Sequence, residues 1–373
     1  MLAVALPGAL FAQGTGPQTD PSNPVKIPID NTAFGGSSAE FLEFGSSARG
    51  MALGGAFATI VDDVNSLHYN PAGLPMMDGP QAAVTIMPYF ADTDYYWAGL
   101  AFPIAEGDYG FGVFLGRFGF SDSPVFTEAD PEGTSGTTFG VDEVVAGFSF
   151  AHAFIDRFTA GVTVKFINDN LATGSLGGAV ARTAAVDFGT NFHSELGGRP
   201  IRIAFVVQNI GGDLTHSGNA LRFREFTPSP TTPDQRLDPP PAEVIASSFP
   251  LPRLLRIAGN YDVVANGQSR LSLLGEFVES NNQAPTVGFG SEFQWEAPET
   301  PIGAALRASW QLQPDERNLG APSADDTNLD GFNFGGGLFY RIAGRYKASF
   351  DYALRHFGAL GTVDVFSFSF GWQ

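Results

Sequence analysis

Residues 46–57 are SSARGMALGGAF, residues 61–63 are VDD and residues 68–74 are HYNPAGL. This stretch is the one part of the chain with the pattern neither of a barrel strand nor of a turn or polar loop. Its glycines remove side chains where two backbones must approach closely, and its alanine, methionine, leucine and phenylalanine residues form a short apolar face at helical spacing. Asn70-Pro71 predicts a turn, because proline fixes its own φ and disfavours helix in the preceding residue. The stretch therefore predicts a small packed plug.

The order of these parts resembles the N-terminal hatch of the FadL superfamily of outer-membrane β-barrels, and most closely its PorV/PorQ branch. The residues that carry the resemblance are Arg49, Gly54, Gly55, Asp62, Asp63, Asn70, Pro71, Ala72 and Gly73. The resemblance implies a barrel of fourteen strands, with residues 34–80 as a helical hatch inside its lumen. Because a buried arginine needs a partner, we expect Arg49 to lie near a lumen carboxylate such as Glu276, Glu292 or Asp351.

The composition favours a sheet whose outer face meets lipid. Charged residues make up only 16% of the 373 residues, whereas aromatic residues reach 13% and include 35 phenylalanines. The net charge of −19 argues against nucleic acid as a partner, because phosphate binding needs a basic surface. The sequence contains no cysteine, which excludes disulfides, thiolate metal sites and thiol nucleophiles.

The start of the chain has the pattern of an export signal. Residues 1–12 are apolar and resemble the end of a secretory signal peptide, although no lysine or arginine precedes them. Residues 13–33 are rich in proline, glycine, threonine and aspartate and predict a flexible linker. No later segment approaches the uncharged apolar run of about 18 residues that a spanning helix needs, so a membrane form must be a closed sheet.

After residue 80 the hydrophobic pattern has a period of two, which predicts a transmembrane β-barrel over residues 81–373. The pattern indicates fourteen strands, most of them about as long as a tilted strand must be to cross a bilayer. Their expected ranges are 81–90, 94–103, 108–119, 142–152, 158–168, 180–193, 199–210, 253–263, 269–279, 285–296, 302–312, 332–343, 345–356 and 362–372.

The two faces of these strands differ in chemistry. In the last strand Phe366, Phe368, Phe370 and Trp372 alternate with serine and glycine. The polar faces carry full charges in strand after strand, which predicts a wet lumen opposite a lipid-facing surface. The expected lumen-lining residues are Arg202, Arg256, Glu276, Glu292, Arg307, Arg341, Arg345, Asp351 and Arg355.

The connections between strands alternate in length. Numbered from the first strand, the even connections are all short, and the long ones (120–141, 169–179, 211–252 and 313–331) are all odd. Bacterial barrels have short periplasmic turns, long outer loops and an even strand number. We therefore expect the protein in the bacterial outer membrane, in contact with its lipid, with both termini in the periplasm.

The sequence predicts neither an enzyme nor a catalytic site. Its five histidines lie singly on different elements, and none has a serine or carboxylate at the spacing of a triad. No cofactor is expected except a calcium ion in an outer loop, where Asp326, Asn328 and Asp330 have the spacing of the first half of a calcium loop. Gly337 replaces the glutamate that would complete such a loop, so an ordinary acidic loop is the alternative.

Two functions remain open. In the first, suggested by the PorV/PorQ resemblance, the barrel is an accessory of type IX-like protein secretion and its partner is a secretion channel or a secreted cargo protein. In the second, suggested by FadL itself, it is an uptake channel for long-chain fatty acids or other hydrophobic small molecules. The form of the hatch favours the first, and so does connection 211–252, whose many prolines predict no regular structure but suit protein docking.

Overall fold

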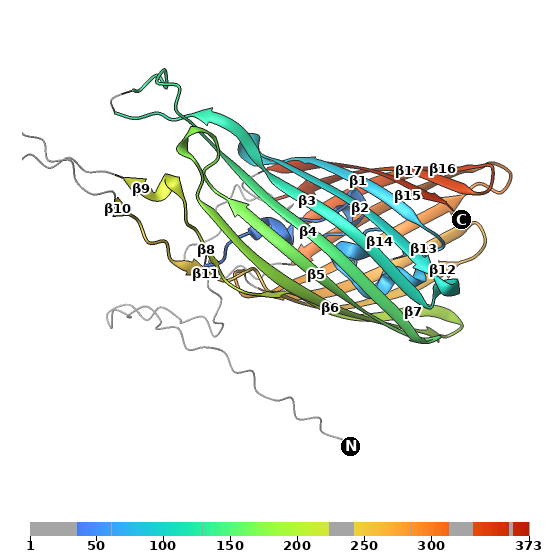
Figure 1. The fold of residues 1–373 in the computed structure, drawn as a ribbon. Helices are drawn as coiled ribbons and strands as arrows, with labels where there is room; N and C mark the ends of the chain where they lie inside the picture. The colour runs from blue at the N-terminus through green and yellow to red at the C-terminus, as the bar shows by residue number, and fades with distance from the viewer. Residues whose placement is uncertain are drawn as a thin grey trace, which may run out of the picture. The chain divides into compact units, whose positions relative to one another are not determined.

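The computed structural model describes residues 36–60, 62–128, 130–223, 242–283, 285–312, 331–357 and 361–372. Within them, fourteen antiparallel strands form one closed barrel, in which β1 is hydrogen-bonded to β18 (Figure 1). The fourteen-stranded antiparallel barrel predicted from the sequence is confirmed. The signal segment 1–12, the linker 13–33 and the calcium-loop residues lie outside the described residues.

The barrel strands begin and end close to the predicted positions. They are β1 (Gln81–Pro88), β2 (Asp94–Ile104), β3 (Tyr109–Pro124), β4 (Thr138–Ile155), β5 (Phe158–Asn170), β6 (Val180–Leu196), β7 (Arg199–Gly211), β12 (Leu254–Ala265), β13 (Ser269–Ser280), β14 (Thr286–Glu296), β15 (Ile302–Leu312), β16 (Phe332–Ile342), β17 (Tyr346–His356) and β18 (Thr362–Trp372). We call the end where β3 leads into β4 the long-loop end, and the end where β1 begins and β18 ends the short-turn end.

Connection 211–252 has more structure than its prolines predicted. Its first part contains β8 (Leu214–Thr215) and β9 (Arg222–Phe223), and its last part contains β10 (Ala242–Glu243) and β11 (Ser248–Phe249). β8 pairs with β11 and β9 pairs with β10, so that two small ribbons project from the long-loop end (Figure 1). The prediction was wrong here because none of the connection's prolines falls within β8, β9, β10 or β11, so none removes a ladder hydrogen bond from these strands.

The barrel wall separates an apolar exterior from a polar interior. Large hydrophobic side chains point outward and are highly exposed, among them Leu306 at 68%, Phe166 at 64% and Leu338 at 62%. Alternate residues point inward, and register places Glu292 of β14 directly opposite Arg307 of β15. Within the described part of the chain, no helix is long and apolar enough to cross a membrane.

Residues 36–80 fold into four short helical elements, η1 (Glu40–Glu43), α1 (Ala48–Ala52), α2 (Ser66–Tyr69) and η2 (Pro71–Met76). The Ser47 side chain caps α1 by accepting a hydrogen bond from Gly50 N, and Gly54 and Gly55 follow the helix at φ values of 64° and 79°, which favour glycine. Most side chains of this N-terminal segment are buried against the inward face of the wall.

Candidate functional site

A patch of glycines on the wall receives the N-terminal segment. Gly161 of β5 and Gly189 of β6 are register partners, and both face inward. A Cβ atom on Gly161 would lie 2.6 Å from the Pro71 carbonyl carbon, and one on Gly189 would lie 2.1 Å from Asn70 Oδ1. Real Cβ atoms do not approach so closely, so only glycine at both positions lets the Asn70-Pro71 turn lie directly on the wall.

Asn70 ties this turn to the wall and to the rest of the segment. Its Nδ2 donates to the Ala58 carbonyl oxygen at 2.9 Å and to the Thr190 carbonyl oxygen of β6 at 3.2 Å, while its Oδ1 accepts from Ala72 N at 3.1 Å. The Ala72 carbonyl oxygen in turn accepts from Thr159 Oγ1 of β5 at 2.7 Å. The Asn70-Pro71-Ala72 turn is therefore hydrogen-bonded to the lumen wall at both β5 and β6.

Arg49 links the segment to another part of the wall, on β14. Its guanidinium donates two parallel hydrogen bonds to the Glu292 carboxylate, at 2.8 and 2.7 Å, and donates further bonds to Asp62 and Asp63 of its own segment at 2.9 and 2.8 Å. Glu292 also accepts from Arg307 Nε at 2.7 Å. Arg49 and Glu292 are almost wholly buried, so each needs the other for charge compensation.

The two aspartates differ in their electrostatic surroundings. Burial favours the neutral form of both, but Arg49 and Arg270 hold the pKa of Asp62 below its usual range. Burial dominates at Asp63 and raises its pKa, although Arg49 opposes the shift. Asp62 is therefore more strongly ionised than Asp63. It also accepts a hydrogen bond from Arg270 Nη1 of β13 at 3.2 Å, which adds another link between the segment and the wall.

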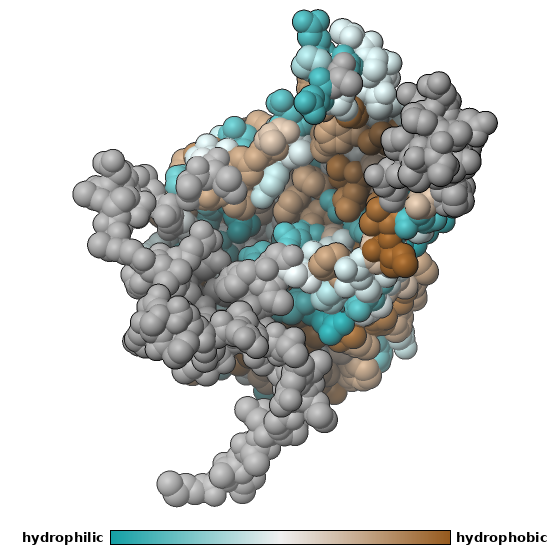
Figure 2. Space-filling view, turned by 90° about the vertical axis from the view of Figure 1, so that its left-hand side faces the viewer, coloured by the Kyte–Doolittle hydropathy of each residue, from teal (hydrophilic) through white to brown (hydrophobic). Residues whose placement is uncertain are grey.

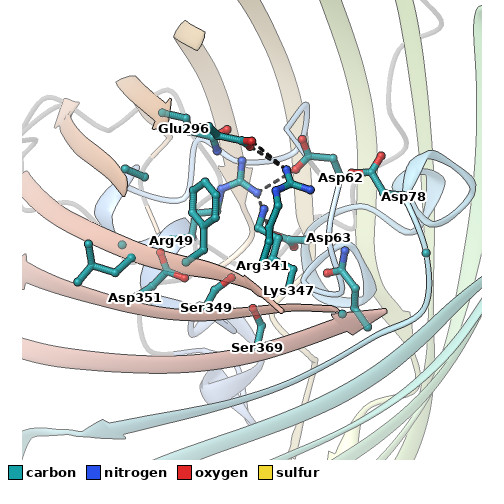
Figure 3. Close-up of a pocket in the computed structure, with 18 of the residues that line it drawn as sticks. Arg49, Asp62, Asp63, Asp78, Glu296, Arg341, Lys347, Ser349, Asp351 and Ser369 are labelled. Atoms are coloured by element: carbon teal, nitrogen blue, oxygen red, sulfur yellow. Dashed lines mark hydrogen bonds and ion pairs between the residues drawn. The ribbon is translucent and has the colours of Figure 1, made fainter. Parts of the chain in front are cut away.

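A polar cavity of about 230 Å³ lies at the short-turn end, beside Arg49. Strand residues Arg341 and Lys347 and segment residues Asp62 and Asp78 line it (Figure 3). Arg341 donates to both carboxylate oxygens of Glu296, at 2.9 and 3.1 Å. We call this cavity the short-turn cavity. The positive and negative side chains of its lining balance, and many of them form ion pairs.

A second cavity, of about 310 Å³, lies at the long-loop end and is called the long-loop cavity. Figure 2 faces this end and shows hydrophobic and hydrophilic residues side by side around the opening. The cavity walls combine aromatic rings, methionines and aliphatic side chains with a few charged groups. The lining includes Glu43, Phe44, Met51, Tyr69, Tyr89, Arg256, Val278, Gln311, Arg355 and Phe357.

The predicted lumen residues fall into three sets, one of which corrects the prediction. Glu292, Arg307 and Asp351 join Arg49 in one network, in which Arg307 Nη1 donates to Asp351 at 2.6 Å. Arg256 and Glu276 form a separate buried pair at 2.8 Å. Inward positions of their strands are also occupied by Arg202, Arg341 and Arg355. Arg345 does not line the lumen, because Ala343 and Gly344 adopt positive φ and place it in an exposed turn.

The sequence did not identify the aromatic side of the long-loop cavity. Phe44, Tyr89 and Phe357 belong to three segments that are far apart in the sequence, and their rings meet only in the folded chain. The Phe44 and Tyr89 ring centroids lie 4.7 Å apart, and those of Tyr89 and Phe357 lie 5.7 Å apart. No cluster of three or more metal-ligating side chains occurs in the described residues, and the calcium-loop prediction falls outside them.

The fold has relatives among solved structures. The toluene transporter TbuX of Ralstonia pickettii superimposes with a TM-score of 0.51 at 14% identity, covering 88% of this chain and 98% of that one. The toluene transporter TodX of Pseudomonas putida gives 0.52 at 11%, covering 88% and 96%, and a TodX deltaS2S3 mutant, a monoaromatic hydrocarbon channel, gives 0.54 at 12%, covering 88% and 98%. The chain has the fold of these barrels.

Comparisons at the level of sequence give no assignment. The chain matches no family model and no curated protein. The three solved structures described above share the fold of this chain, and nothing in the comparisons supports the PorV/PorQ branch.

Proposed function

We propose that the protein is an uptake channel for hydrophobic small molecules. The observation that carries the proposal is the long-loop cavity, which offers an apolar and aromatic wall at the mouth of a barrel whose lumen is occupied by residues 36–80. The shared fold with two toluene transporters supports it. Small-molecule sites typically combine apolar and aromatic side chains with a few polar groups, and this cavity offers both kinds.

The same proposal includes a place in the outer membrane with both termini in the periplasm. Support comes from the exposed apolar exterior and from the aromatic side chains near the short-turn end, such as Trp295, Tyr340 and Tyr346. The long connections would then face outward and present the long-loop cavity to the cell's surroundings.

Residues 36–80 act in this proposal as the hatch that closes the lumen. Deleting them should raise the single-channel conductance in planar bilayers severalfold, because the segment fills the lumen between two walls. Circular dichroism should show that the deleted protein keeps its β-sheet. A folded barrel with unchanged conductance would count against a hatch.

Uptake is tested by filling the long-loop cavity. Val278 points into it from β13, so Val278→Trp should reduce uptake of labelled toluene and of a labelled long-chain fatty acid into cells that depend on this barrel. Phe289→Trp is the matched control, because Phe289 is 54% exposed on the outer face of β14. Equal uptake of both compounds with and without the wild-type protein would refute the proposal.

The same experiment also tests the role in protein secretion, which the hatch pattern favoured over uptake. Surface delivery of secreted proteins is measured in the cells that carry Val278→Trp. Reduced delivery with unchanged uptake would reverse the ranking of the two functions.

A further inference from the structure

Arg355 is the exceptional charge of the long-loop cavity. It lies at an inward position near the end of β17 and is partly buried. Its guanidinium donates to Met51 Sδ and to Gln311 Oε1, both at 3.2 Å, and it stands over the Phe357 ring at 4.8 Å from the centroid. All three partners are neutral. Among the described residues, no carboxylate forms an ion pair with Arg355.

The other arginine of this cavity is in the opposite situation. Arg256 Nη1 lies 2.8 Å from Glu276 Oε1, and Arg256 Nε donates to Gln208 at 2.7 Å. Its charge is therefore balanced inside the wall. A guanidinium has five N–H donors, and Arg355 uses two of them on weak or neutral acceptors. Among the described residues that line the cavity, Arg355 is thus the cation that can bind an external anion.

The carboxylates of the cavity do not cancel this charge. Glu43 accepts from Ser280 Oγ at 3.0 Å and from Gln283 Nε2 at 2.5 Å, on the β13–β14 side, whereas Arg355 is bonded to Gln311 of β15. Burial raises the pKa of Glu43 to about 7, so this carboxyl group is mostly neutral in mildly acidic solution. Glu40 accepts from Ser37 Oγ and Asn282 Nδ2 and belongs to the same side.

The apolar surroundings of Arg355 define the body of the ligand. Phe357, Tyr89 and Phe44 form a continuous aromatic cluster, and Tyr69 and Met51 complete the wall beside it. Aromatic rings prefer offset or edge-to-face contact with other rings, which this cluster offers. The cavity, at about 310 Å³, is at the small end of ligand sites and suits one substituted ring.

We infer that the long-loop cavity binds small aromatic acids, with Arg355 contacting the carboxylate and the Phe44–Tyr89–Phe357 cluster contacting the ring. This inference deepens the proposed uptake function and rests on it for its physiological meaning. It assigns to this chain a charge selectivity that a purely apolar site would lack. Arg355 is then the residue that determines specificity between an acid and a neutral hydrocarbon.

The test compares probes that share a butylphenyl body and carry an anionic group, no polar group or a cationic group. Binding of 4-butylbenzoate, butylbenzene and 4-butylbenzylammonium to the purified barrel in detergent is measured by calorimetry at pH 6. The wild-type protein should bind the benzoate at least about tenfold more tightly than the hydrocarbon, because a charge-assisted hydrogen bond is gained. It should bind the ammonium most weakly.

Variants assign this preference to Arg355. Arg355→Gln should bind the benzoate and the hydrocarbon with nearly equal affinity, and Arg355→Lys should keep part of the preference. Arg182→Gln is the matched control: Arg182 is an exposed residue of β6, bonded to Asn168. Heat-modifiable mobility on gels verifies that each variant is folded. A benzoate preference that survives in Arg355→Gln, or is absent from the wild type, overturns the inference.

Uptake of the same probes separates this inference from the proposed function. An Arg355-dependent binding preference without uptake of any probe would leave the binding site standing and refute the channel. Uptake of the hydrocarbon with no binding preference for the benzoate would leave the channel standing and refute the binding site.

Discussion

The two cavities of the lumen lie on either side of the N-terminal segment and use arginine in different ways. At the short-turn end, Arg49 and Arg307 share Glu292 within 2.8 Å, and Arg341 is paired with Glu296. At the long-loop end, the partners of Arg355 among the described residues are neutral, and aromatic rings lie beside it. The difference teaches that, in the proposed function, anchoring and ligand contact are separated along the barrel axis. Charges that are paired inside the wall hold the segment, and the arginine without a carboxylate partner among the described residues is the one proposed to contact the ligand.

Breaking the anchor should have the largest effect. Arg49→Met leaves Asp63 without its arginine and Glu292 with one arginine instead of two, so the free energy of unfolding should fall by about 3–5 kcal/mol. Urea titration of the barrel in detergent measures this change. Binding at the long-loop cavity should weaken too, because Met51 and Tyr69 belong to the segment that Arg49 holds.

A matched control isolates the effect of burial at the anchor. Arg117 and Asp142 form an ion pair whose side chains are 58% and 37% exposed, so Arg117→Met should change the stability by about 1 kcal/mol or less. Adding Asp63→Asn to Arg49→Met should recover part of the loss, because the carboxylate that has lost its arginine is then neutral. Equal losses from Arg49→Met and Arg117→Met would show that the anchor is not a distinct region.

A smaller effect is expected at the turn that lies on the glycine patch. Asn70→Asp keeps the shape but replaces the Nδ2 donor, so the carbonyl oxygens of Ala58 and Thr190 lose a partner at a cost of about 1–3 kcal/mol. Asn266→Asp is the control, since the Asn266 side chain accepts hydrogen bonds through Oδ1 from backbone N–H groups of an exposed turn, and aspartate can accept them too. The same urea titration compares them, and equal stability of the two variants would contradict the role given to Asn70.

The smallest expected effect is a pH dependence at the long-loop end. Burial raises the pKa of Glu43 from 4.5 to about 7, so the folded protein holds this proton more tightly than the unfolded chain does. Stability should therefore decrease as the pH rises from about 4.5 to 7, where the group must ionise in its buried position. Thermal unfolding of Glu43→Gln should lack this decrease. If both proteins respond to pH equally, Glu43 is not the titrating group.

The sequence predicted the barrel well because the barrel rests on local patterns. Alternation has a period of two residues, and turn and loop lengths are local too, so the strand limits required no knowledge of distant contacts. The one misplaced lumen residue, Arg345, follows an alternation that continues into a turn. Positive φ at Ala343 and Gly344 ends the strand there, and the polar pattern alone does not reveal it.

The site was less predictable because its contacts are distant in sequence. The Arg49–Glu292 bond joins residues 243 positions apart, and the sequence could only place Glu292 among several carboxylates. The aromatic cluster joins the segment to the ends of β1 and β17, outside any periodic pattern. These contacts depend on the register of the barrel strands and on the position of the segment in the lumen. No local sequence pattern predicts either of them.

The glycine patch under the Asn70-Pro71 turn also bears on which part of the chain sets the width of the proposed channel. Where Gly161 and Gly189 face the lumen, the wall contributes no side chains that could narrow a passage. In the proposed channel, the N-terminal segment closes the lumen over these two positions. A displacement of the segment by a few ångströms would therefore change the aperture directly, with no rearrangement of the strands, and substitutions in residues 46–74 could retune the width of the passage while the scaffold stays constant.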